Sequence, residues 1–313
     1  MKVLFIDTTH PILPEKLEEL GFQCDFFSNY SYDDYLNCIG DYDGVVIRSK
    51  IKLDKAFLKQ AQKLKFIARV GSGMENIDMV FAESRGIHCI NSPEGNRDAL
   101  AEHALGMILS LRNHLKRVDT EVRNGIWLRE ENRGFEMMGK TLGIIGFGNM
   151  GAAFAQRLQG FEMNIIAYDK YKQGYGNHYV KEVDIESLYK ESDIISFHVP
   201  LTKETHYMFD QKWIEKMEKS FYLINTARGP VVNTNDLLVG IKEGKVLGAA
   251  LDVLEFEGTS FEKLKDEELP EPYKKLMQCE KVLLSPHIAG WSIESNIKLS
   301  SVIVEKVKAL GII

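Results

Sequence analysis

The stretch Thr141-Leu-Gly-Ile-Ile-Gly146-Phe-Gly148-Asn-Met-Gly151 decides how this chain folds. A short apolar, strand-forming run leads into three glycines with the spacing GxGxxG, and a helix-forming segment follows. In such a loop the first glycine permits a tight turn, the second lets the backbone approach a pyrophosphate, and the third lets the helix pack on the strand. The helix N-terminus adds N–H groups and a positive potential. The stretch therefore predicts a dinucleotide-binding unit, although glycine turns of this kind also occur without a nucleotide.

Short apolar runs alternate with helical segments on both sides of this stretch, which predicts repeated βαβ units and parallel sheets. The first series of expected strands is Lys2–Asp7, Cys24–Ser28, Gly44–Ser49, Phe66–Val70 and His88–Asn91. The second series is Thr141–Ile145, Asn164–Tyr168, Ile194–His198, Phe221–Asn225, Gly248–Val253 and Val282–Ser285. Because the second series matches the size of a doubly wound dinucleotide fold, we expect an α/β protein with two Rossmann-like or flavodoxin-like parallel-sheet domains.

A break between the two series predicts a domain boundary. The turn-rich segment Ser92–Asn96 precedes a long helical pattern over 98–123, for which Asp98 is the expected N-cap. The amphipathic segment Ile293–Leu310 predicts a last helix that returns to the first domain. The expected arrangement is a dinucleotide-binding domain, residues 98–288, inserted into a substrate-binding domain of residues 1–97 and 289–313.

The composition is that of a soluble globular protein, with 44% hydrophobic and 27% charged residues. A formal net charge of −6 argues against a nucleic-acid partner. The first apolar run meets Asp7 too early for a signal peptide, and no stretch approaches the roughly 20 apolar residues of a membrane span, so we expect a cytoplasmic protein. The four cysteines lie far apart in the sequence, at Cys24, Cys38, Cys89 and Cys279. Their spacing suits neither a zinc site nor a disulfide framework, so we expect reduced thiols.

An acidic residue follows the strand after the glycine loop. Asp169 lies eighteen positions after Gly151, close to where a carboxylate accepts hydrogen bonds from a ribose diol. A carboxylate there would repel a 2′-phosphate, so we expect NAD rather than NADP, although Lys170 and Lys172 could soften that repulsion. The alternative is that Asp169 is an ordinary acid at a strand end.

Three ionisable residues follow later strands. Arg228 comes after Phe221–Asn225, and Glu257 and His287 follow the next two expected strands. Taken singly, they could be a surface cation, part of an acidic loop and a buried core histidine. Because the carboxyl ends of parallel strands meet at one edge of a sheet, where ligands bind, we expect them to form one site.

Together these motifs resemble the D-isomer-specific 2-hydroxyacid dehydrogenase family over nearly the whole chain. The matching segments are Ala68–Asp78, Asn91–Asn96, Ala101–Glu102, Gly146–Gly151, His198–Leu201, Asn225–Gly229, Gly248–Asp252 and Ser285–Gly290. The resemblance implies an NAD-dependent enzyme that moves a hydride between C2 of a D-2-hydroxy acid and nicotinamide. It also implies a homodimer formed through the 98–123 helix and the segment up to Gly139.

The resemblance implies a role for each site residue. Arg228 would bind the substrate carboxylate and the C2 oxygen, and His287 would exchange the hydroxyl proton while Glu257 orients it and favours its imidazolium. The implied cofactor-binding residues are Gly146, Gly148, Asn149, Met150, Gly151, Asp169, His198, Val199, Pro200, Thr205, Thr226, Ala227, Asp252, His287 and Gly290. The implied substrate-binding residues are Arg48, Ser49, Arg69, Gly71, Ser72, Gly73, Asn96, Arg228 and His287, with backbone N–H groups of Gly71–Gly73 on the carboxylate.

The resemblance specifies the reaction class and leaves more than one substrate open. The segment Val46–Lys50 is similar to that of D-3-phosphoglycerate dehydrogenases, in which an arginine helps to bind phosphate. Arg48, Arg69 and Arg129 from a neighbouring subunit would supply such a cluster, so we expect oxidation of D-3-phosphoglycerate to 3-phosphohydroxypyruvate at the entry to serine synthesis. If Arg48 and Arg69 are only solvated cations, hydroxypyruvate or glyoxylate reduction becomes the alternative.

Two further expectations follow from comparison with the family. This chain has Gly258 where the family often has proline, followed by a longer acidic segment, Thr259–Pro270, which alters the expected rim of the site. The chain ends soon after His287, so we expect no added regulatory domain. A more distant alternative is an NAD-sensing corepressor-like protein, but such a sensor would not need an acid–base pair.

Overall fold

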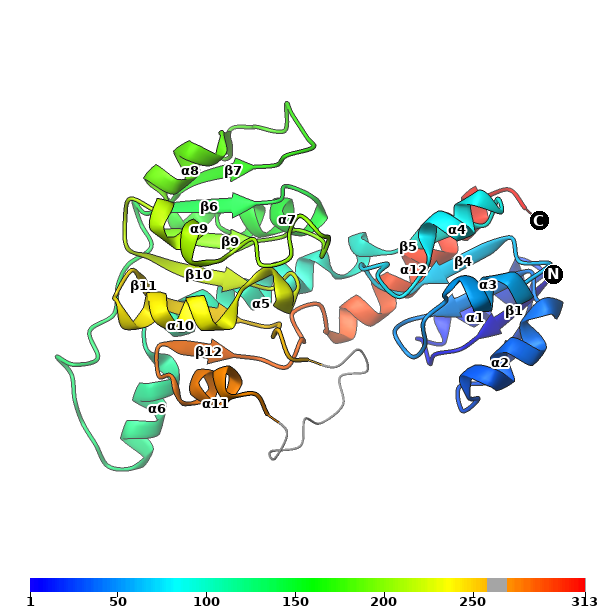
Figure 1. Ribbon diagram of the computed structural model, residues 1–313, viewed down its shortest axis with the longest axis horizontal. Helices are drawn as coiled ribbons and strands as arrows, with labels where there is room; N and C mark the ends of the chain where they lie inside the picture. Colours follow the sequence, from blue (N-terminus) through cyan, green and yellow to red (C-terminus); the bar gives the residue numbers. More distant parts are fainter. Residues whose placement is uncertain (258–268, 313) are drawn as a thin grey trace. The chain divides into compact units, whose positions relative to one another are not determined.

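The computed structural model describes residues 1–257 and 269–312 and divides them into two compact units. Unit 1 comprises residues 1–96 and 291–312, and unit 2 comprises residues 97–257 and 269–290 (Figure 1). The boundaries expected from the sequence, 97/98 and 288/289, lie within two residues of this division. Each unit contains one sheet in which all described strand pairs are parallel, so the predicted α/β class is confirmed.

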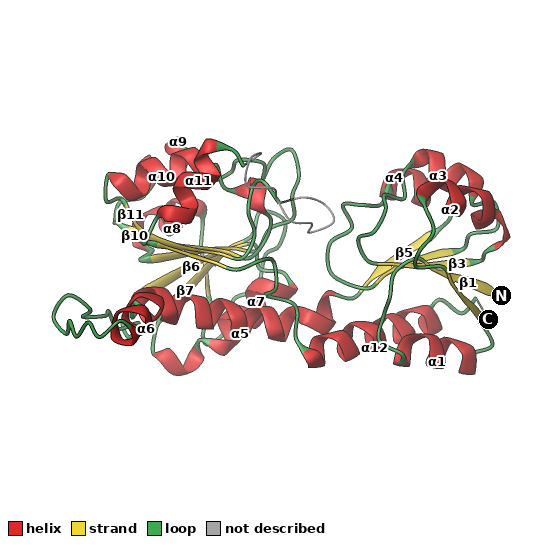
Figure 2. Ribbon diagram, turned by 90° about the horizontal axis from the view of Figure 1, so that it is seen from below, coloured by secondary structure: helices red, strands yellow, loops and turns green. Residues whose placement is uncertain are grey.

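The sheet of unit 1 has the strand order β2-β1-β3-β4-β5. Its strands are β1 (Lys2–Phe5), β2 (Gln23–Phe26), β3 (Gly44–Ile47), β4 (Phe66–Arg69) and β5 (His88–Asn91). Its helices are α1 (Ile12–Glu19), α2 (Tyr32–Cys38), α3 (Lys55–Gln60), α4 (Met79–Ser84) and α12 (Ile293–Ala309). Figure 2 shows α2, α3 and α4 on one face of the sheet and α1 and α12 on the other. Both faces are therefore covered, as the uninterrupted apolar strands require.

The sheet of unit 2 has the strand order β12-β11-β10-β9-β6-β7-β8. Its strands are β6 (Thr141–Ile145), β7 (Asn164–Tyr168), β8 (Lys181–Glu182), β9 (Ile194–Phe197), β10 (Phe221–Asn225), β11 (Val246–Leu251) and β12 (Val282–Leu284). The helices are α5 (Pro93–Arg112, which begins in unit 1), α6 (Leu115–Arg123), α7 (Asn149–Arg157), α8 (Ile185–Glu191), α9 (Gln211–Lys216), α10 (Thr234–Lys242) and α11 (Glu271–Gln278). The strand order reverses between β6 and β9, where doubly wound folds bind nucleotides.

The start of the long helix differs from the prediction. Asp98 is not an N-cap, because α5 already begins at Pro93, and proline is well suited to a first helical turn. The Asp98 carboxylate instead accepts a hydrogen bond from Arg157 of α7 at 3.1 Å. The expected single helix over 98–123 is also broken, because His114 adopts φ +53° and separates α5 from α6.

A long-range contact lies beside the break between α5 and α6. The Arg112 guanidinium at the end of α5 donates to the carbonyl oxygens of Phe135 and Glu136 at 3.2 and 2.6 Å. This contact holds the returning segment beside the end of α5, and no glycine or proline marks the break in the sequence. The sequence does not predict helix α2 or the two-residue edge strand β8, because both segments are short.

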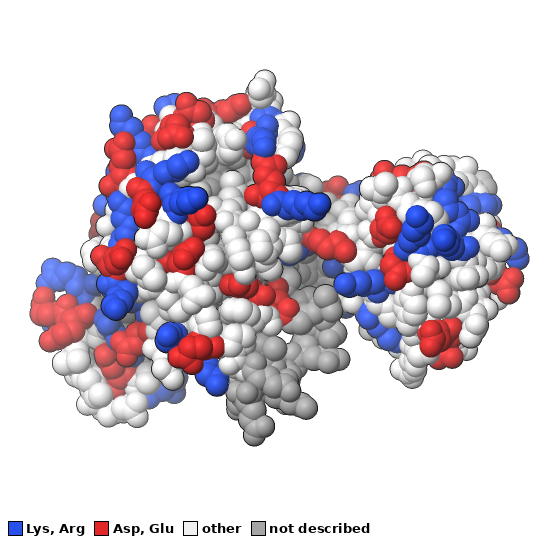
Figure 3. Space-filling model, in the orientation of Figure 1, with Lys and Arg blue, Asp and Glu red and all other residues white. Residues whose placement is uncertain are grey.

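The charged side chains on the surface are of both signs, as the similar numbers of basic and acidic residues predict. On the face shown in Figure 3, the Lys and Arg side chains of unit 2 are interspersed with Asp and Glu. Across the part of the chain that the structure describes, no helix is both long and apolar enough to cross a membrane.

Two glycines of α5 test the packing of this helix. A Cβ atom on Gly95 would lie 2.5 Å from the backbone nitrogen of Leu299 in α12, whereas a Cβ atom on Gly106 would meet no atom within 4 Å. We expect Gly95→Ala to lower the free energy of unfolding by about 1–3 kcal/mol through overpacking. Gly106→Ala should raise it by about 0.5–1 kcal/mol, because alanine restricts the unfolded chain. Urea unfolding of both variants measures this, and equal effects would show that α5 does not approach α12 so closely.

Candidate active site

The glycine loop after β6 has the geometry that its sequence predicts. Gly146 adopts φ +90°, and a Cβ atom there would lie 2.5 Å from the carbonyl oxygen of His198. A Cβ atom on Gly151 would lie 2.2 Å from the Gly146 oxygen, so the start of α7 can pack on the strand only with glycine. A Cβ atom on Gly148 would meet nothing within 4 Å, which leaves space beside the N-terminus of α7. The loop therefore offers backbone N–H groups to an anionic ligand.

Asp169 follows β7 and fixes the neighbouring loop. Its carboxylate accepts hydrogen bonds from the backbone nitrogens of Phe147 at 2.8 Å, Tyr171 at 2.9 Å and Lys172 at 3.1 Å. The Lys170 ammonium pairs with Glu204, and that of Lys172 donates to the Phe147 carbonyl. Both lysines thus have partners other than Asp169, and the negative charge at the end of β7 favours a ribose diol over a 2′-phosphate.

The turns after β9 and β10 hold the other predicted cofactor contacts. Burial lowers the pKa of His198 to about 3, so its ring is neutral at pH 7, and its Nε2 lies 2.8 Å from Ser196 Oγ. Thr205 Oγ1 donates to the Pro200 carbonyl at 2.6 Å. The buried Thr226 Oγ1 has no hydrogen-bond partner within residues 1–257 and 269–312. An unpartnered buried hydroxyl, an open glycine and a strand-end carboxylate suit a bound dinucleotide.

The remaining predicted cofactor residues lie at the same carboxyl ends of the strands. Asn149 and Met150 begin α7, Val199 follows β9, Ala227 follows β10, and Gly290 comes after β12. Asn225 holds the turn after β10, because its side-chain oxygen accepts from the Ala227 nitrogen at 3.1 Å and its nitrogen donates to the Arg228 carbonyl at 3.0 Å.

A buried carboxylate holds the turn that carries His287. Asp252, directly after β11, is 1% exposed and accepts hydrogen bonds from the backbone nitrogens of Ile288 at 2.9 Å and Ala289 at 2.8 Å. Ser285 Oγ also donates to it at 2.6 Å, and His103 Nε2 of α5 lies 3.0 Å from the same hydroxyl. His287 itself adopts φ +56°, an uncommon conformation for a residue other than glycine. The Asp252 contacts hold this strained turn in place.

The hydrogen bonds also set the protonation of Asp252. Burial alone would raise its pKa, but hydrogen bonds from His103, Ser285 and the backbone nitrogens of Ala289 and Ile288 lower the pKa to about 2. The carboxylate is therefore ionised at neutral pH. The sequence predicts Asp252 as a cofactor-binding residue, and in the structure its carboxylate holds the His287 turn.

The three predicted catalytic residues all lie in unit 2. Glu257 Oε1 lies 3.1 Å from His287 Nδ1, so this contact occupies Nδ1 and not Nε2 of the ring. Arg228 begins a tight turn in which a Cβ atom on Gly229 would lie 1.9 Å from the Leu254 carbonyl. The Arg228 turn thus packs against the backbone of the segment that carries Glu257. Gly258 and the segment to residue 268, which the sequence singles out as a departure, lie outside the described residues.

The predicted substrate residues of unit 1 follow β3, β4 and β5. Asp7 accepts hydrogen bonds from the backbone nitrogens of Arg48 at 2.6 Å and Ser49 at 3.2 Å. Ser72 Oγ donates to Asn96 Oδ1 at 2.7 Å, which brings two predicted contacts together. The Arg69 side chain lies over Gly71, since a Cβ atom on that glycine would be 1.4 Å from Arg69 Nη1.

One predicted backbone donor is already used. The Gly71 N–H donates to the Arg69 carbonyl at 2.9 Å and to Ser92 Oγ at 3.1 Å, so it is not available to a substrate carboxylate. The N–H groups of Ser72 and Gly73 have no acceptor in the described part of the chain. The prediction of a carboxylate held by this loop is therefore narrowed to Ser72 and Gly73.

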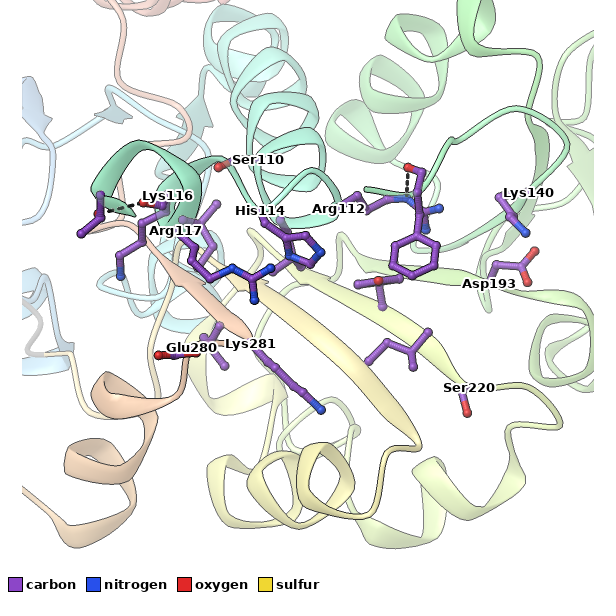
Figure 4. Close-up of a pocket in the computed structure, with 17 residues that line it drawn as sticks. Ser110, Arg112, His114, Lys116, Arg117, Lys140, Asp193, Ser220, Glu280 and Lys281 are labelled. Atoms are coloured by element: carbon purple, nitrogen blue, oxygen red, sulfur yellow. Dashed lines mark hydrogen bonds between the residues drawn. The ribbon is translucent and has the colours of Figure 1, made fainter. Parts of the chain in front are cut away.

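A separate cavity of roughly 650 Å³ lies at the opposite edge of the unit 2 sheet. Figure 4 shows Asp193, Ser220 and Lys281 around it, each just before a strand, together with residues from the end of α5 and from α6. Its apolar lining includes Leu111 and Tyr222. Because the cavity lies at the amino ends of the strands, it is distinct from the candidate active site. Within the described residues, no group of three or more potential ligands could hold a metal ion.

Substitution of Asp252 tests the link between this carboxylate and the His287 turn. Its pKa is lowered in the folded state, so its stabilisation is fully present above pH 4 and is lost as pH falls from about 4 to about 2. We expect Asp252→Asn to lower the free energy of unfolding at pH 7 by about 2 kcal/mol and to flatten its acid dependence. Urea unfolding between pH 3 and 8 measures both effects, with Asp33→Asn on α2 as the control for lost charge. A parent-like acid dependence in Asp252→Asn would refute the assignment.

Comparison with known proteins places these residues in one family. The family model described as "D-isomer specific 2-hydroxyacid dehydrogenase, NAD binding domain" matches residues 105–289. A D-3-phosphoglycerate dehydrogenase of Archaeoglobus fulgidus is 34% identical over 98% of this chain, and the chain spans 56% of that relative's length. A hydroxypyruvate reductase of Thermotoga maritima is 37% identical over 90% of this chain and 89% of its own length.

A solved structure supports the same conclusion. The D-lactate dehydrogenase of Aquifex aeolicus, determined in complex with NAD and lactic acid, has a TM-score of 0.83 and 30% identity over 99% of this chain and 95% of its own. The NAD-binding family match covers the glycine loop, Asp169, the Arg228 turn and His287. The chain therefore belongs to the D-isomer-specific 2-hydroxyacid dehydrogenase family and has that family's NAD-binding domain.

Proposed function

We propose that this protein transfers a hydride between NAD and C2 of a D-2-hydroxy acid, with D-3-phosphoglycerate and 3-phosphohydroxypyruvate as its substrate pair. The contact that supports the reaction class best is the 3.1 Å pair of His287 and Glu257 on a turn fixed by Asp252. A binding protein without chemistry would not need an acid–base pair on a strained turn.

Each residue has a defined task in this reaction. His287 Nε2 takes the C2 hydroxyl proton during oxidation and returns it during reduction, while Glu257 holds Nδ1 and stabilises the imidazolium. The Arg228 guanidinium binds the substrate carboxylate and polarises the C2 oxygen, for which its planar fork is well suited. NAD, when bound, accepts or supplies the hydride. Thr226, Asp169 and the N-terminus of α7 would hold it.

Arg48 of unit 1 supports the proposed phosphorylated substrate. Arg48 lies directly after β3, and its guanidinium makes no hydrogen bond to an acceptor within residues 1–257 and 269–312. A half-buried guanidinium with available donors suits a dianionic phosphate. The names of the curated relatives include D-3-phosphoglycerate dehydrogenase, hydroxypyruvate reductase and glyoxylate reductase, so reduction of an unphosphorylated 2-oxo acid is the second candidate.

The decisive experiment is NADH oxidation with 3-phosphohydroxypyruvate, hydroxypyruvate and glyoxylate, compared as kcat/KM. We expect the phosphorylated substrate to be preferred, and we expect Arg48→Gln to lower its kcat/KM by about 30-fold, equivalent to about 2 kcal/mol for a charge-assisted hydrogen bond. The same variant should change glyoxylate reduction by less than about threefold, because glyoxylate has no phosphate. Equal or better turnover of hydroxypyruvate or glyoxylate by the parent would assign the second candidate.

A control variant separates the enzyme from an NAD-sensing protein. His287→Ala should abolish hydride transfer while NADH still binds, as measured by nucleotide fluorescence. A parent protein that binds NADH but reduces no 2-oxo acid would support the sensor instead.

We also propose that the protein is a homodimer formed through α6 and the segment that follows it. Helix α6 has no buried residue, yet Leu115 and Val122 lie seven positions apart on one face and are 50% and 51% exposed. Trp127, Phe135 and Met138 are more than half exposed in the following segment. A helix that exposes an apolar face favours burial against a partner, and the family resemblance makes a second copy the expected one.

Sedimentation velocity at about 10 µM tests the dimer. We expect a dimer for the parent and a monomer for the double variant Leu115→Glu with Val122→Glu, because two buried charges would oppose association. Val80→Glu, which changes an 81% exposed valine on α4, is the matched control and should leave the dimer intact. If the parent sediments as a monomer, the proposed dimer is wrong, and the proposed reaction is unaffected.

A further inference from the structure

Arg48 and Trp291 form a stacked pair in unit 1, although they are far apart in the sequence. The guanidinium carbon of Arg48 lies 4.2 Å from the centre of the Trp291 ring system. Arginine stacks on tryptophan through cation–π attraction, which leaves the N–H groups on its edge able to bind other partners. Trp291 is 64% exposed, so it is not a residue of the hydrophobic core.

The backbone of Arg48 is fixed on two sides. Asp7, which follows β1, accepts hydrogen bonds from the Arg48 and Ser49 nitrogens at 2.6 and 3.2 Å. Asn76 Nδ2 donates to the Arg48 carbonyl at 3.3 Å. The strand order of this sheet reverses between β1 and β3, and open α/β sheets bind ligands at such a reversal. Arg48 is therefore a rigidly based cation at a place suited to a ligand.

The Arg48 guanidinium lies over the Trp291 ring system. Within the residues that the structure describes, Asp7 is the acid whose charge acts on this guanidinium, and no acceptor receives a hydrogen bond from it. Arginine carries five N–H donors in a fixed fork. Without the ring, the long side chain could adopt many rotamers, and binding an anion would require all of them to be restricted.

The position of Trp291 is itself well determined. It precedes Ser292, the N-cap of α12, whose side chain accepts from the Ser295 nitrogen while Ser295 Oγ accepts from the Ser292 nitrogen, both within 2.9 Å. The ring is thus anchored at the start of a helix.

We propose that Trp291 is a positioning residue that determines substrate specificity, because it holds the Arg48 guanidinium with its N–H edge toward the phosphate of the substrate. This inference rests on the proposed function and adds a residue that the family motifs do not mark. The stack favours a substrate with a second oxyanion far from the C1 carboxylate, and it contributes nothing to a short acid such as glyoxylate.

Steady-state kinetics of Trp291→Ala and Trp291→Phe test this role. For 3-phosphohydroxypyruvate, we expect Trp291→Ala to raise KM about tenfold with kcat within twofold, in line with the strength of cation–π contacts. The KM for glyoxylate should stay within twofold, and Trp291→Phe should restore most of the affinity because phenylalanine retains an aromatic face. Ile293→Ala, at an 82% exposed position two residues further on, is the matched control and should behave as the parent.

The outcomes separate this inference from the proposed substrate. Equal loss for all three substrates, or no change in any, would overturn the role of Trp291 even if the parent prefers the phosphorylated acid. If the parent prefers glyoxylate or hydroxypyruvate, inorganic phosphate becomes the probe, as an inhibitor of glyoxylate reduction. Weaker inhibition of both Trp291→Ala and Arg48→Gln would then support the stacked anion site while the proposed substrate fails. Inhibition that neither substitution changes would overturn both the proposed substrate and the anion site formed by Arg48 and Trp291.

Discussion

The hydrogen bonds of the buried Asp252 carboxylate fix the part of unit 2 on which the proposed chemistry depends. A buried negative charge is costly unless several donors surround it, and here the donors come from α5 and from the turn after β12. Because two of those donors are the backbone nitrogens directly after His287, the same bonds that stabilise the charge also hold His287 at its positive φ. Such strain costs on the order of 1–3 kcal/mol and persists only where the surroundings enforce it. The acid–base residue is thus held before any substrate binds.

The fold was predictable to the extent that it depends on local pattern. Apolar alternation located all six expected strands of unit 2 and all five of unit 1, with ends displaced by a few residues. The pattern could not locate what depends on distant contacts. Asp98 has the chemistry of an N-cap, but the chain already turns helical at Pro93. The break at His114 has no glycine or proline signal, and Arg112 just before it donates to carbonyl groups more than twenty residues further on.

The candidate site shows the same division. Motif spacing predicted one site for Arg228, Glu257 and His287, because each follows a strand and the parallel order brings strand ends to one edge. It did not identify His103, whose ring reaches Ser285 across the interior of unit 2, since the rotation of α5 decides which side chains face the sheet. Trp291 carries no periodic or motif signal toward Arg48, so their stacking could not be foreseen from the sequence. The sequence also did not predict that the Gly71 N–H donates to the Arg69 carbonyl and to Ser92 Oγ.

One arrangement recurs three times and explains why strand-end acids are hard to interpret from sequence alone. Asp7 follows β1 and binds backbone N–H groups of the loop after β3, its neighbour in the sheet. Asp169 follows β7 and binds the loop after β6, and Asp252 follows β11 and binds the turn after β12. Where a parallel strand ends, the N–H groups of the neighbouring loop lose their ladder partners, and a short carboxylate can replace them. The three loops so fixed carry Arg48, the nucleotide glycines and His287. For these aspartates a structural role and a functional role are therefore the same role, because fixing the loop is what places the ligand-binding groups.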